Sequence, residues 1–311
     1  MTGTDQVYLG IDWSGVTPAF RLAPVGSSEP ARLVPVEGPM RFRTAEPPVR
    51  YCGGWFDLSG PQGRHVLCDG WRRLETGRQC DRCRQREGFV VAHQSYDAPA
   101  SQLPENLREY LGRPHRLYVD VFADGTVKVG TVAECRLHAR LAEQGPVAAY
   151  YVASAADGLV VRRLEAAVSR RFGLPQSVSA TRKLRGLTGR VDTHVLQASA
   201  REVATDVAGC VAELAGRGSG VAAIDPPEPW RVPPIAAAVF AATPLAMYPD
   251  PLTSGEHSLY FHGLAGSIGL FSVVADDDAD RYVANLDQLY GTAVLFGDYR
   301  SRVGSVQPAL F

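Results

Sequence analysis

Residues 115–132 read HRLYVDVFADGTVKVGTV, and this stretch decides the central part of the fold. Two short apolar runs flank the tetrapeptide Ala123-Asp124-Gly125-Thr126. An Asp-Gly pair between two such runs is a strong signal for a β-hairpin, because these residues readily adopt the backbone angles of a tight turn. We therefore predict two antiparallel strands joined by this turn.

Beyond the hairpin, the sequence changes to helical spacing twice. Residues 133–144 and 158–172 both repeat apolar side chains at intervals of three and four, which predicts two amphipathic helices. Between them, VAAYYVASA at 147–155 reads as a strand, and Gly173 predicts the end of the second helix. The predicted order of this central unit is ββαβα.

Four of the six cysteines fall in one segment, at Cys52, Cys68, Cys80 and Cys83. The C-x2-C pair lets two thiolates reach one tetrahedral ion, and four thiolates leave no coordination position open. We therefore predict one structural zinc. A disulfide is less favoured because nothing in the sequence indicates an oxidising compartment, and the polar flanks do not suit a redox C-x-x-C motif. Cys135 and Cys210 are expected to pack as small apolar residues.

Arginines gather in two places along the chain. Around the predicted zinc site, next to Trp71, they are Arg72, Arg73, Arg78, Arg82, Arg84 and Arg86. After the hairpin, a second basic group comprises Arg162, Arg163, Arg170, Arg171, Arg182, Lys183, Arg185 and Arg190. Guanidinium groups beside an aromatic face suit phosphate contacts and base stacking, so we expect nucleic acid as a partner. Interspersed acidic residues leave an ordinary solvated surface as the alternative.

The composition fits an ordinary globular protein. Of 311 residues, 45% are hydrophobic and 21% charged, and the formal net charge is −1, so any basic surface must be local. The apolar stretch 235–247 is too short to span a bilayer, and the first residues show no signal peptide, so we expect a cytoplasmic protein. The only lysines are Lys128 and Lys183.

These patterns together predict an α+β protein in four parts. They are a β-rich N-terminal region at 1–50, a zinc-binding module at 51–95, the central domain at 113–200, and a helix plus a β-rich C-terminal region at 201–311. A linker at 96–114, with a short helix at 104–111, separates the second part from the third. The two β-rich ends are candidates for one shared further domain.

The central unit resembles the GIY-YIG nuclease fold. In that family, a Tyr on the first hairpin strand and a Tyr-Ile-Gly on the second face a helix that carries Arg, and a Glu on a later helix binds one magnesium ion. The corresponding residues here are Tyr118, the run Lys128-Val129-Gly130, Arg140 and Glu165. Lys128 stands where the second motif tyrosine falls.

The chain is more closely similar to a bacterial domain-of-unknown-function family that joins a four-cysteine module to a divergent GIY-YIG-like unit. The likeness rests on the cysteines, on Pro114-His115 before Tyr118, and on the run Lys128-Val129-Gly130. It extends through Arg140-Leu141 and Glu143-Gln144-Gly145 to Glu165 and the β-rich residues 263–291, so it covers most of the chain.

The resemblance implies a magnesium-dependent phosphodiesterase that acts on nucleic acid. In that activity Tyr118 would orient or activate water, with His115 as an alternative base, and Lys128 would hold phosphate or lower the pKa of Tyr118. Arg140 would stabilise charge on the phosphate, and Glu165 would bind the magnesium ion.

Two other functions fit the same residues. One is a zinc-containing protein that binds nucleic acid without cleaving it, with Lys128 retained as a phosphate contact. The other is an enzyme that uses the cleft on a small molecule, with Lys128 as an amine nucleophile or as the group that polarises a carbonyl. In the plainest interpretation, Tyr118 is an ordinary strand aromatic, Arg140 and Glu165 are exposed helix charges, and His115 is a turn residue.

Overall fold

The computed structural model describes residues 5–60, 63–87, 103, 105–215, 219–276 and 279–302. Parts of several predictions lie outside these residues. They are residues 61–62 and 88–95 of the zinc module, residues 96–102 and 104 of the linker and its short helix, and residues 1–4, 216–218, 277–278 and 303–311 of the N- and C-terminal regions.

The predicted α+β class and the hairpin are confirmed. Strands β7 (His115–Val121) and β8 (Val127–Ala133) pair antiparallel, and the turn sets a register that places Tyr118 opposite Gly130 and Asp120 opposite Lys128. The elements that follow are η2 (Glu134–Arg136), α4 (Leu137–Gln144), β9 (Ala148–Ala155) and α5 (Gly158–Phe172). Their order is the predicted ββαβα. The Asp157 side chain accepts a hydrogen bond from the backbone N–H of Val160 and so begins α5.

The central unit continues beyond residue 200. Helix α7 (Thr193–Leu214) begins at the N-cap Asp192, earlier than the sequence pattern indicates. Strand β10 (Val221–Pro229) then joins the central sheet, whose order is β10-β9-β7-β8. The sequence of β10 contains three prolines, which are rare in strands, so the strand could not be recognised from sequence. The prolines are tolerated because β10 is an edge strand. The remaining helices of this part are α3 (Glu105–Leu111), α6 (Ala180–Gly186) and α8 (Pro234–Ala241).

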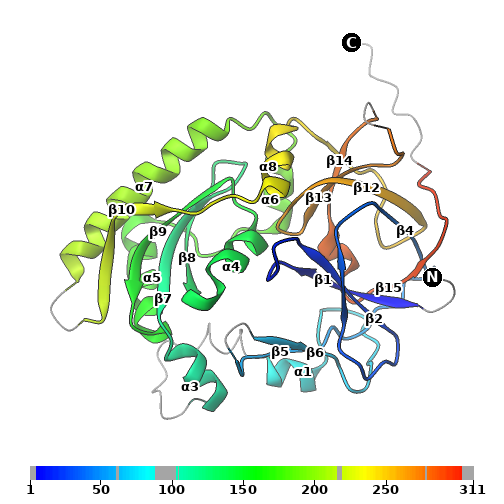
Figure 1. Ribbon diagram of the computed structural model, residues 1–311, viewed down its shortest axis with the longest axis horizontal. Helices are drawn as coiled ribbons and strands as arrows, with labels where there is room; N and C mark the ends of the chain where they lie inside the picture. The colour runs from blue at the N-terminus through cyan, green and yellow to red at the C-terminus, as the bar shows by residue number, and fades with distance from the viewer. Residues whose placement is uncertain are drawn as a thin grey trace.

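Among the described residues, nine strands form the larger sheet, in the order β11-β14-β13-β12-β4-β15-β1-β2-β3. Its N-terminal members are β1 (Gln6–Asp12), β2 (Ala19–Pro24), β3 (Arg32–Pro35) and β4 (Pro39–Thr44). Its C-terminal members are β11 (Ala246–Met247), β12 (Glu256–Ala265), β13 (Ile268–Ser272), β14 (Tyr282–Asn285) and β15 (Ala293–Phe296). Strand β15 pairs with both β1 and β4, so the two ends of the chain form one sheet (Figure 1).

Both faces of the central sheet are covered, because successive strand residues point to opposite sides. On one face, Leu117 packs in the same core as Val161 of α5 and Val207 of α7. On the other face, Tyr118 shares a second core with α4 and with residues of the larger sheet, such as Leu264. The central unit and the larger sheet therefore meet along the α4 side of the hairpin.

The cysteine segment adds a small third part, which Figure 1 shows at the lower edge of the view. It consists of β5 (Trp55–Asp57) paired with β6 (Arg64–Val66), the short helix α1 (Asp81–Arg86), and loops. It is tied to the larger sheet by a backbone hydrogen bond of 2.7 Å from Tyr51 N–H to the Gly291 carbonyl. No helix in the described part of the chain has the length and apolar character needed to cross a membrane.

Candidate functional site

The four cysteines of the predicted zinc module lie together. Their Sγ atoms all lie within 4.8 Å of one another, and those of Cys68 and Cys80 are 3.9 Å apart. Thiolates bound to one tetrahedral ion at about 2.3 Å stand roughly 3.8 Å from each other, so this spacing fits a four-coordinate metal. Within the described ranges, no other group of three or more Cys, His, Asp or Glu side chains is placed to hold an ion.

Local backbone geometry supports the cysteine cluster. The backbone N–H of Cys80 donates to Cys52 Sγ at 3.2 Å, and Cys80 is also the N-cap of α1, which carries Cys83 one turn later. Cys135 and Cys210 lie elsewhere, the first partly buried and the second buried, as expected for packed thiols. All six cysteines are free of disulfide bonds.

Three polar side chains of the hairpin form a buried cluster. Lys128 Nζ donates to the Tyr118 hydroxyl at 3.1 Å and lies 3.2 Å from Asp120 Oδ2. Tyr118, Asp120 and Lys128 are 1%, 0% and 2% exposed. Gly130 makes room for the Tyr118 ring, because a Cβ at that position would lie 2.5 Å from Cζ of Tyr118. The glycine of the Lys-Val-Gly run is thus required by packing.

Lys128 is charged in this environment. Burial by itself lowers the pKa of Lys128, but the Asp120 carboxylate and the Tyr118 hydroxyl outweigh burial and raise that pKa above its ordinary value. The protonated amine of Lys128 is therefore favoured over the free amine that a nucleophile requires.

Glu165 is buried beside this cluster, at 3% exposure, and is not the exposed helix charge of the plainest interpretation. Its Oε2 lies 2.6 Å from a guanidinium nitrogen of Arg162, one turn earlier on α5. Burial raises the pKa of Glu165, and attraction to Arg162, Lys128 and Arg140 only partly opposes that rise. Tyr118, Lys128 and Glu165 are therefore all buried beneath the protein surface.

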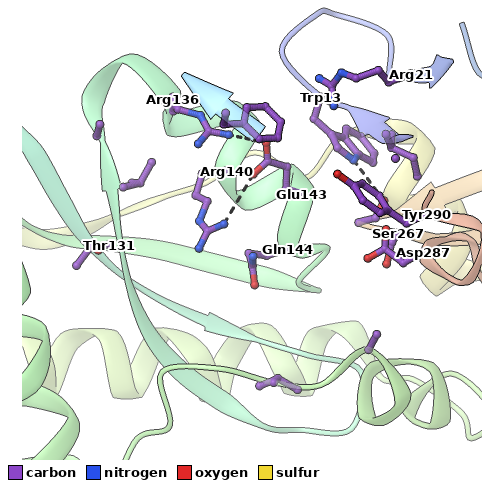
Figure 2. Close-up of a pocket in the computed structure, with 18 of the residues that line it drawn as sticks. Trp13, Arg21, Thr131, Arg136, Arg140, Glu143, Gln144, Ser267, Asp287 and Tyr290 are labelled. Carbon is purple, nitrogen blue, oxygen red and sulfur yellow. Dashed lines mark hydrogen bonds and ion pairs between the residues drawn. The ribbon is translucent and has the colours of Figure 1, made fainter. Parts of the chain in front are cut away.

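Arg140 faces a pocket of about 550 Å³ between the central unit and the larger sheet (Figure 2). Helix α4 contributes Arg140, Glu143 and Gln144 to its wall, and Arg136 comes from η2 directly before it. Further wall residues come from β8, α5, α6 and β1, from the β12–β13 turn, and from the 3₁₀ helix η3 (Leu286–Leu289). The cysteine segment adds Arg78. All three parts of the molecule meet at this pocket.

Cationic side chains outnumber carboxylates on the pocket wall. The cations are Arg21, Arg78, Arg136, Arg140, Arg162 and Lys183, and the carboxylates are Glu143 and Asp287. Four of these arginines have an acidic partner of their own, in the pairs Arg21–Asp12, Arg78–Asp287, Arg136–Glu143 and Arg162–Glu165. Arg140 only shares Glu143, at 3.8 Å, and Lys183 donates to the neutral Gln144 carbonyl at 2.7 Å. The wall therefore holds a surplus of two positive charges.

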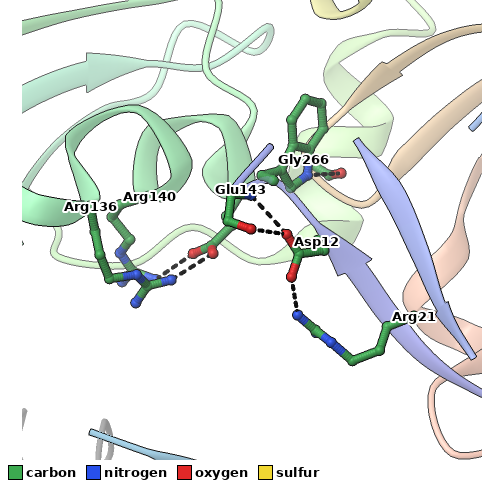
Figure 3. Close-up of polar contacts among 8 residues, drawn as sticks. Asp12, Arg21, Arg136, Arg140, Glu143 and Gly266 are labelled. Carbon is green, nitrogen blue, oxygen red and sulfur yellow. Dashed lines mark hydrogen bonds and ion pairs between the residues drawn. The ribbon is translucent and has the colours of Figure 1, made fainter. Parts of the chain in front are cut away.

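The other side of the pocket is built by the larger sheet (Figure 3). The indole N–H of Trp13 donates to the Gly266 carbonyl at 3.3 Å, which fixes β1 against the β12–β13 turn. Arg21 of β2 is held by Asp12 at the end of β1, while Glu143 of α4 pairs with Arg136 and Arg140. Acidic residues of the larger sheet and of α4 thus hold the arginines of the pocket in place.

Burial lowers the pKa of two groups that line the pocket, Lys183 and His115. Burial, with repulsion from Lys128 and Arg140, lowers the pKa of Lys183 to about 8. Burial also lowers the pKa of His115, so its imidazole is neutral at pH 7. Because His115 Nδ1 donates to the Arg113 carbonyl at 2.8 Å, Nε2 is its basic nitrogen.

Only part of the predicted site reaches the pocket. Arg140 and His115 line it, whereas Tyr118, Lys128 and Glu165 lie behind its wall. The sequence analysis did not single out Trp13, Arg21, Asp287 or Tyr290, since nothing local marks them and they come from distant segments. Lys183 did carry a signal, being one of two lysines in an arginine-rich chain.

Comparison of the chain with protein-family models, with curated proteins and with solved structures found no match. The functional conclusion therefore rests on the pocket and on the cysteine cluster.

Proposed function

We propose that this protein binds nucleic acid through a phosphate group held in the pocket beside α4. The surplus of two positive charges at Arg140 and Lys183 carries this proposal. A phosphomonoester has a charge of about −1.5 to −2 at pH 7, so a terminal phosphate matches that surplus. Guanidinium groups also bind phosphate oxygens in a bidentate manner, which favours Arg140 as the primary contact.

The size of the pocket supports a strand end as the ligand. Its volume of about 550 Å³ lies in the range typical of small-ligand sites, roughly 300–1,000 Å³. It accommodates a terminal nucleotide, whereas a duplex is too wide to enter. Trp13 and Tyr290 add aromatic surface to the same wall, and nucleobases stack on such side chains.

We propose further that the cysteine cluster binds one structural zinc ion. Cys52, Cys68, Cys80 and Cys83 supply four thiolate ligands, so the ion has no position open for substrate. Zinc in this site would stabilise the fold of the cysteine segment, and the chemistry of the ligand pocket would fall to the side chains of the protein.

Fluorescence anisotropy with a labelled short single strand tests the phosphate site. We expect a terminal phosphate to strengthen binding, inorganic phosphate to compete, and affinity to fall as salt rises. Arg140→Gln and Lys183→Gln should each weaken binding about 10-fold or more, since a charged hydrogen bond contributes roughly 1.5–3 kcal/mol. Arg43→Gln is the control, because Arg43 stacks on Tyr299 away from the pocket. Binding that is indifferent to salt and to both pocket changes would contradict the proposal.

Hydrolysis of the bound strand is the second candidate, and one observation favours it. His115 Nε2 is a neutral base on the pocket wall, near the arginines that would hold a phosphodiester. In this activity water would lose a proton to His115 and form a new P–O bond, while the ester P–O bond breaks and its electron pair stays on the leaving oxygen. That oxygen would take a proton from solvent and leave as a hydroxyl, and His115 would return its own proton to solvent. Tyr118 and Lys128 do not line the pocket, and Glu165, to which the resemblance assigns magnesium, is buried in an ion pair with Arg162.

Incubation with labelled single-stranded, duplex and branched DNA or RNA and magnesium distinguishes cleavage from binding. We expect His115→Gln to abolish cleavage while leaving terminal-phosphate binding in place. Glu165→Gln tests the magnesium role in the same assay, because it removes the charge and keeps the shape of the side chain. Intact strands under every condition would leave binding as the function.

A further inference from the structure

The cysteine segment reaches directly into the ligand pocket. Arg78 lies two residues before Cys80 and lines the pocket wall. Its guanidinium is 3.1 Å from Asp287 Oδ2 and 4.8 Å from the ring centre of Tyr290, another wall residue. With its side chain 58% exposed, Arg78 is the pocket cation of the cysteine segment that can turn toward a bound anion.

The residue beside the first cysteine fixes both Arg78 and Tyr290. The backbone N–H of Gly53 donates to the Arg78 carbonyl at 2.9 Å, and the Tyr290 hydroxyl donates to the Gly53 carbonyl at 3.4 Å. A Cβ at position 53 would lie 2.6 Å from Cζ of Tyr290, so the ring rests directly on this glycine. Any movement of Cys52 and Gly53 is therefore passed to two pocket residues.

The cysteines lie at the centre of this segment. Its described regular structure is a pair of three-residue strands and one six-residue helix. Its small core consists of Cys52, Cys68 and Cys83, with Trp55, Leu74 and Cys80 packed against them. A metal bound by the four thiolates would restrain the backbone on both sides of Arg78, since structural metal sites supply folding energy to such modules.

We infer that the cysteine module is part of the ligand site, so that metal binding at the cysteines and phosphate binding in the pocket strengthen each other. Arg78 is the residue through which the module contacts the phosphate of the bound strand. This inference rests on the proposed phosphate-binding function. Coupling between two sites is reciprocal: if metal raises the affinity for the strand, the strand must raise the affinity for metal by the same factor.

The test measures both directions of the coupling. Anisotropy with a terminally phosphorylated single strand compares zinc-loaded protein with protein stripped by a chelator, and we expect about 10-fold weaker binding after stripping. In the second direction, competition with a coloured chelator measures zinc release at equilibrium, and we expect the bound strand to raise the zinc affinity by a similar factor. Circular dichroism before and after stripping reports whether the chain is still folded.

Two variants separate coupling from folding. Arg78→Gln should retain one zinc per chain, bind the strand about 10-fold more weakly, and lose the effect of the strand on zinc release. Arg43→Gln is the matched control, because Arg43 also stacks on a tyrosine, at 5.5 Å from the Tyr299 ring centre, but outside the pocket. It should behave as the unchanged protein in both assays.

The outcomes distinguish this inference from the function on which it rests. Zinc-loaded protein that does not bind the strand overturns both. If zinc-loaded protein binds the strand, two results overturn the inference and leave the phosphate site intact. One is a strand effect on zinc release that persists in Arg78→Gln, and the other is the lack of any such effect in the unchanged protein. The zinc-release assay starts from folded, zinc-loaded protein, so its result holds even if stripping unfolds the cysteine segment.

Discussion

Lys183 carries an amine that titrates close to physiological pH. Burial and neighbouring cations lower its pKa to about 8, below the ordinary value of about 10.4. An anion binds the protonated form, so strand affinity should be high at pH 7 and fall as the pH rises through about 8. Because the unfolded chain holds this proton more tightly, stability should rise between pH 8 and 10.

Anisotropy titrations between pH 7 and pH 9 check the Lys183 prediction. A terminal phosphate keeps its charge over this interval, since its second pKa is about 6, so the change reports the protein. Lys183→Arg is the control, because a guanidinium stays protonated throughout. An equal loss of affinity in the Lys183→Arg protein would show that another group is titrating.

Among single residues, Lys128 should contribute strongly to the free energy of unfolding through its ion pair with Asp120. Both side chains are at most 2% exposed, and their charged atoms are 3.2 Å apart. Lys128→Met leaves the Asp120 carboxylate buried without its cation, which should cost about 3–5 kcal/mol in urea unfolding. The double change Asp120→Asn with Lys128→Met should recover much of that loss. Additive losses would mean that the two groups do not act as a pair.

At the scale of one element, β8 depends on a glycine that accommodates the ring opposite. Gly130→Ala pushes a methyl group into Tyr118, and overpacking of this kind should cost about 1–3 kcal/mol in urea unfolding. Gly189→Ala is the matched control, because a Cβ there meets no atom within 4 Å and should change stability by less than about 0.5 kcal/mol. Equal effects of the two changes would show that the Tyr118 ring moves aside without cost.

Elements with local signals could be predicted from sequence, and elements defined by context could not. The boundaries of α5 follow from its apolar spacing and from Gly173, and the hairpin follows from its Asp-Gly turn. Strand β10 was missed because prolines are rare in strands, and only its place at the sheet edge permits them. Helix α8 lies in an apolar stretch without a polar face, so its sequence shows burial but not helical periodicity.

For the whole molecule, metal removal should lower the stability of the larger sheet and the pocket as well as that of the cysteine segment. This segment is hydrogen-bonded to Gly291 of the larger sheet and contributes Arg78 to the pocket. We expect Cys52→Ser to lose its metal, measured as zinc per chain by mass spectrometry, and to lower the midpoint of thermal unfolding. Cys135→Ser should keep one zinc per chain, because Cys135 lies outside the cluster. Full zinc content in Cys52→Ser would contradict a four-cysteine site.

The sequence by itself determined the central ββαβα order, the hairpin with its turn, and the four cysteines that now lie within 4.8 Å of one another. Each depends on short-range rules: turn chemistry, helical periodicity and ligand spacing. Only the tertiary structure decided that Tyr118, Lys128 and Glu165 are buried, and that Arg78, Arg140 and Lys183 share one pocket. These outcomes depend on pairing strands from opposite ends of the chain and packing that sheet against α4, and no local pattern encodes the contacts between such distant segments.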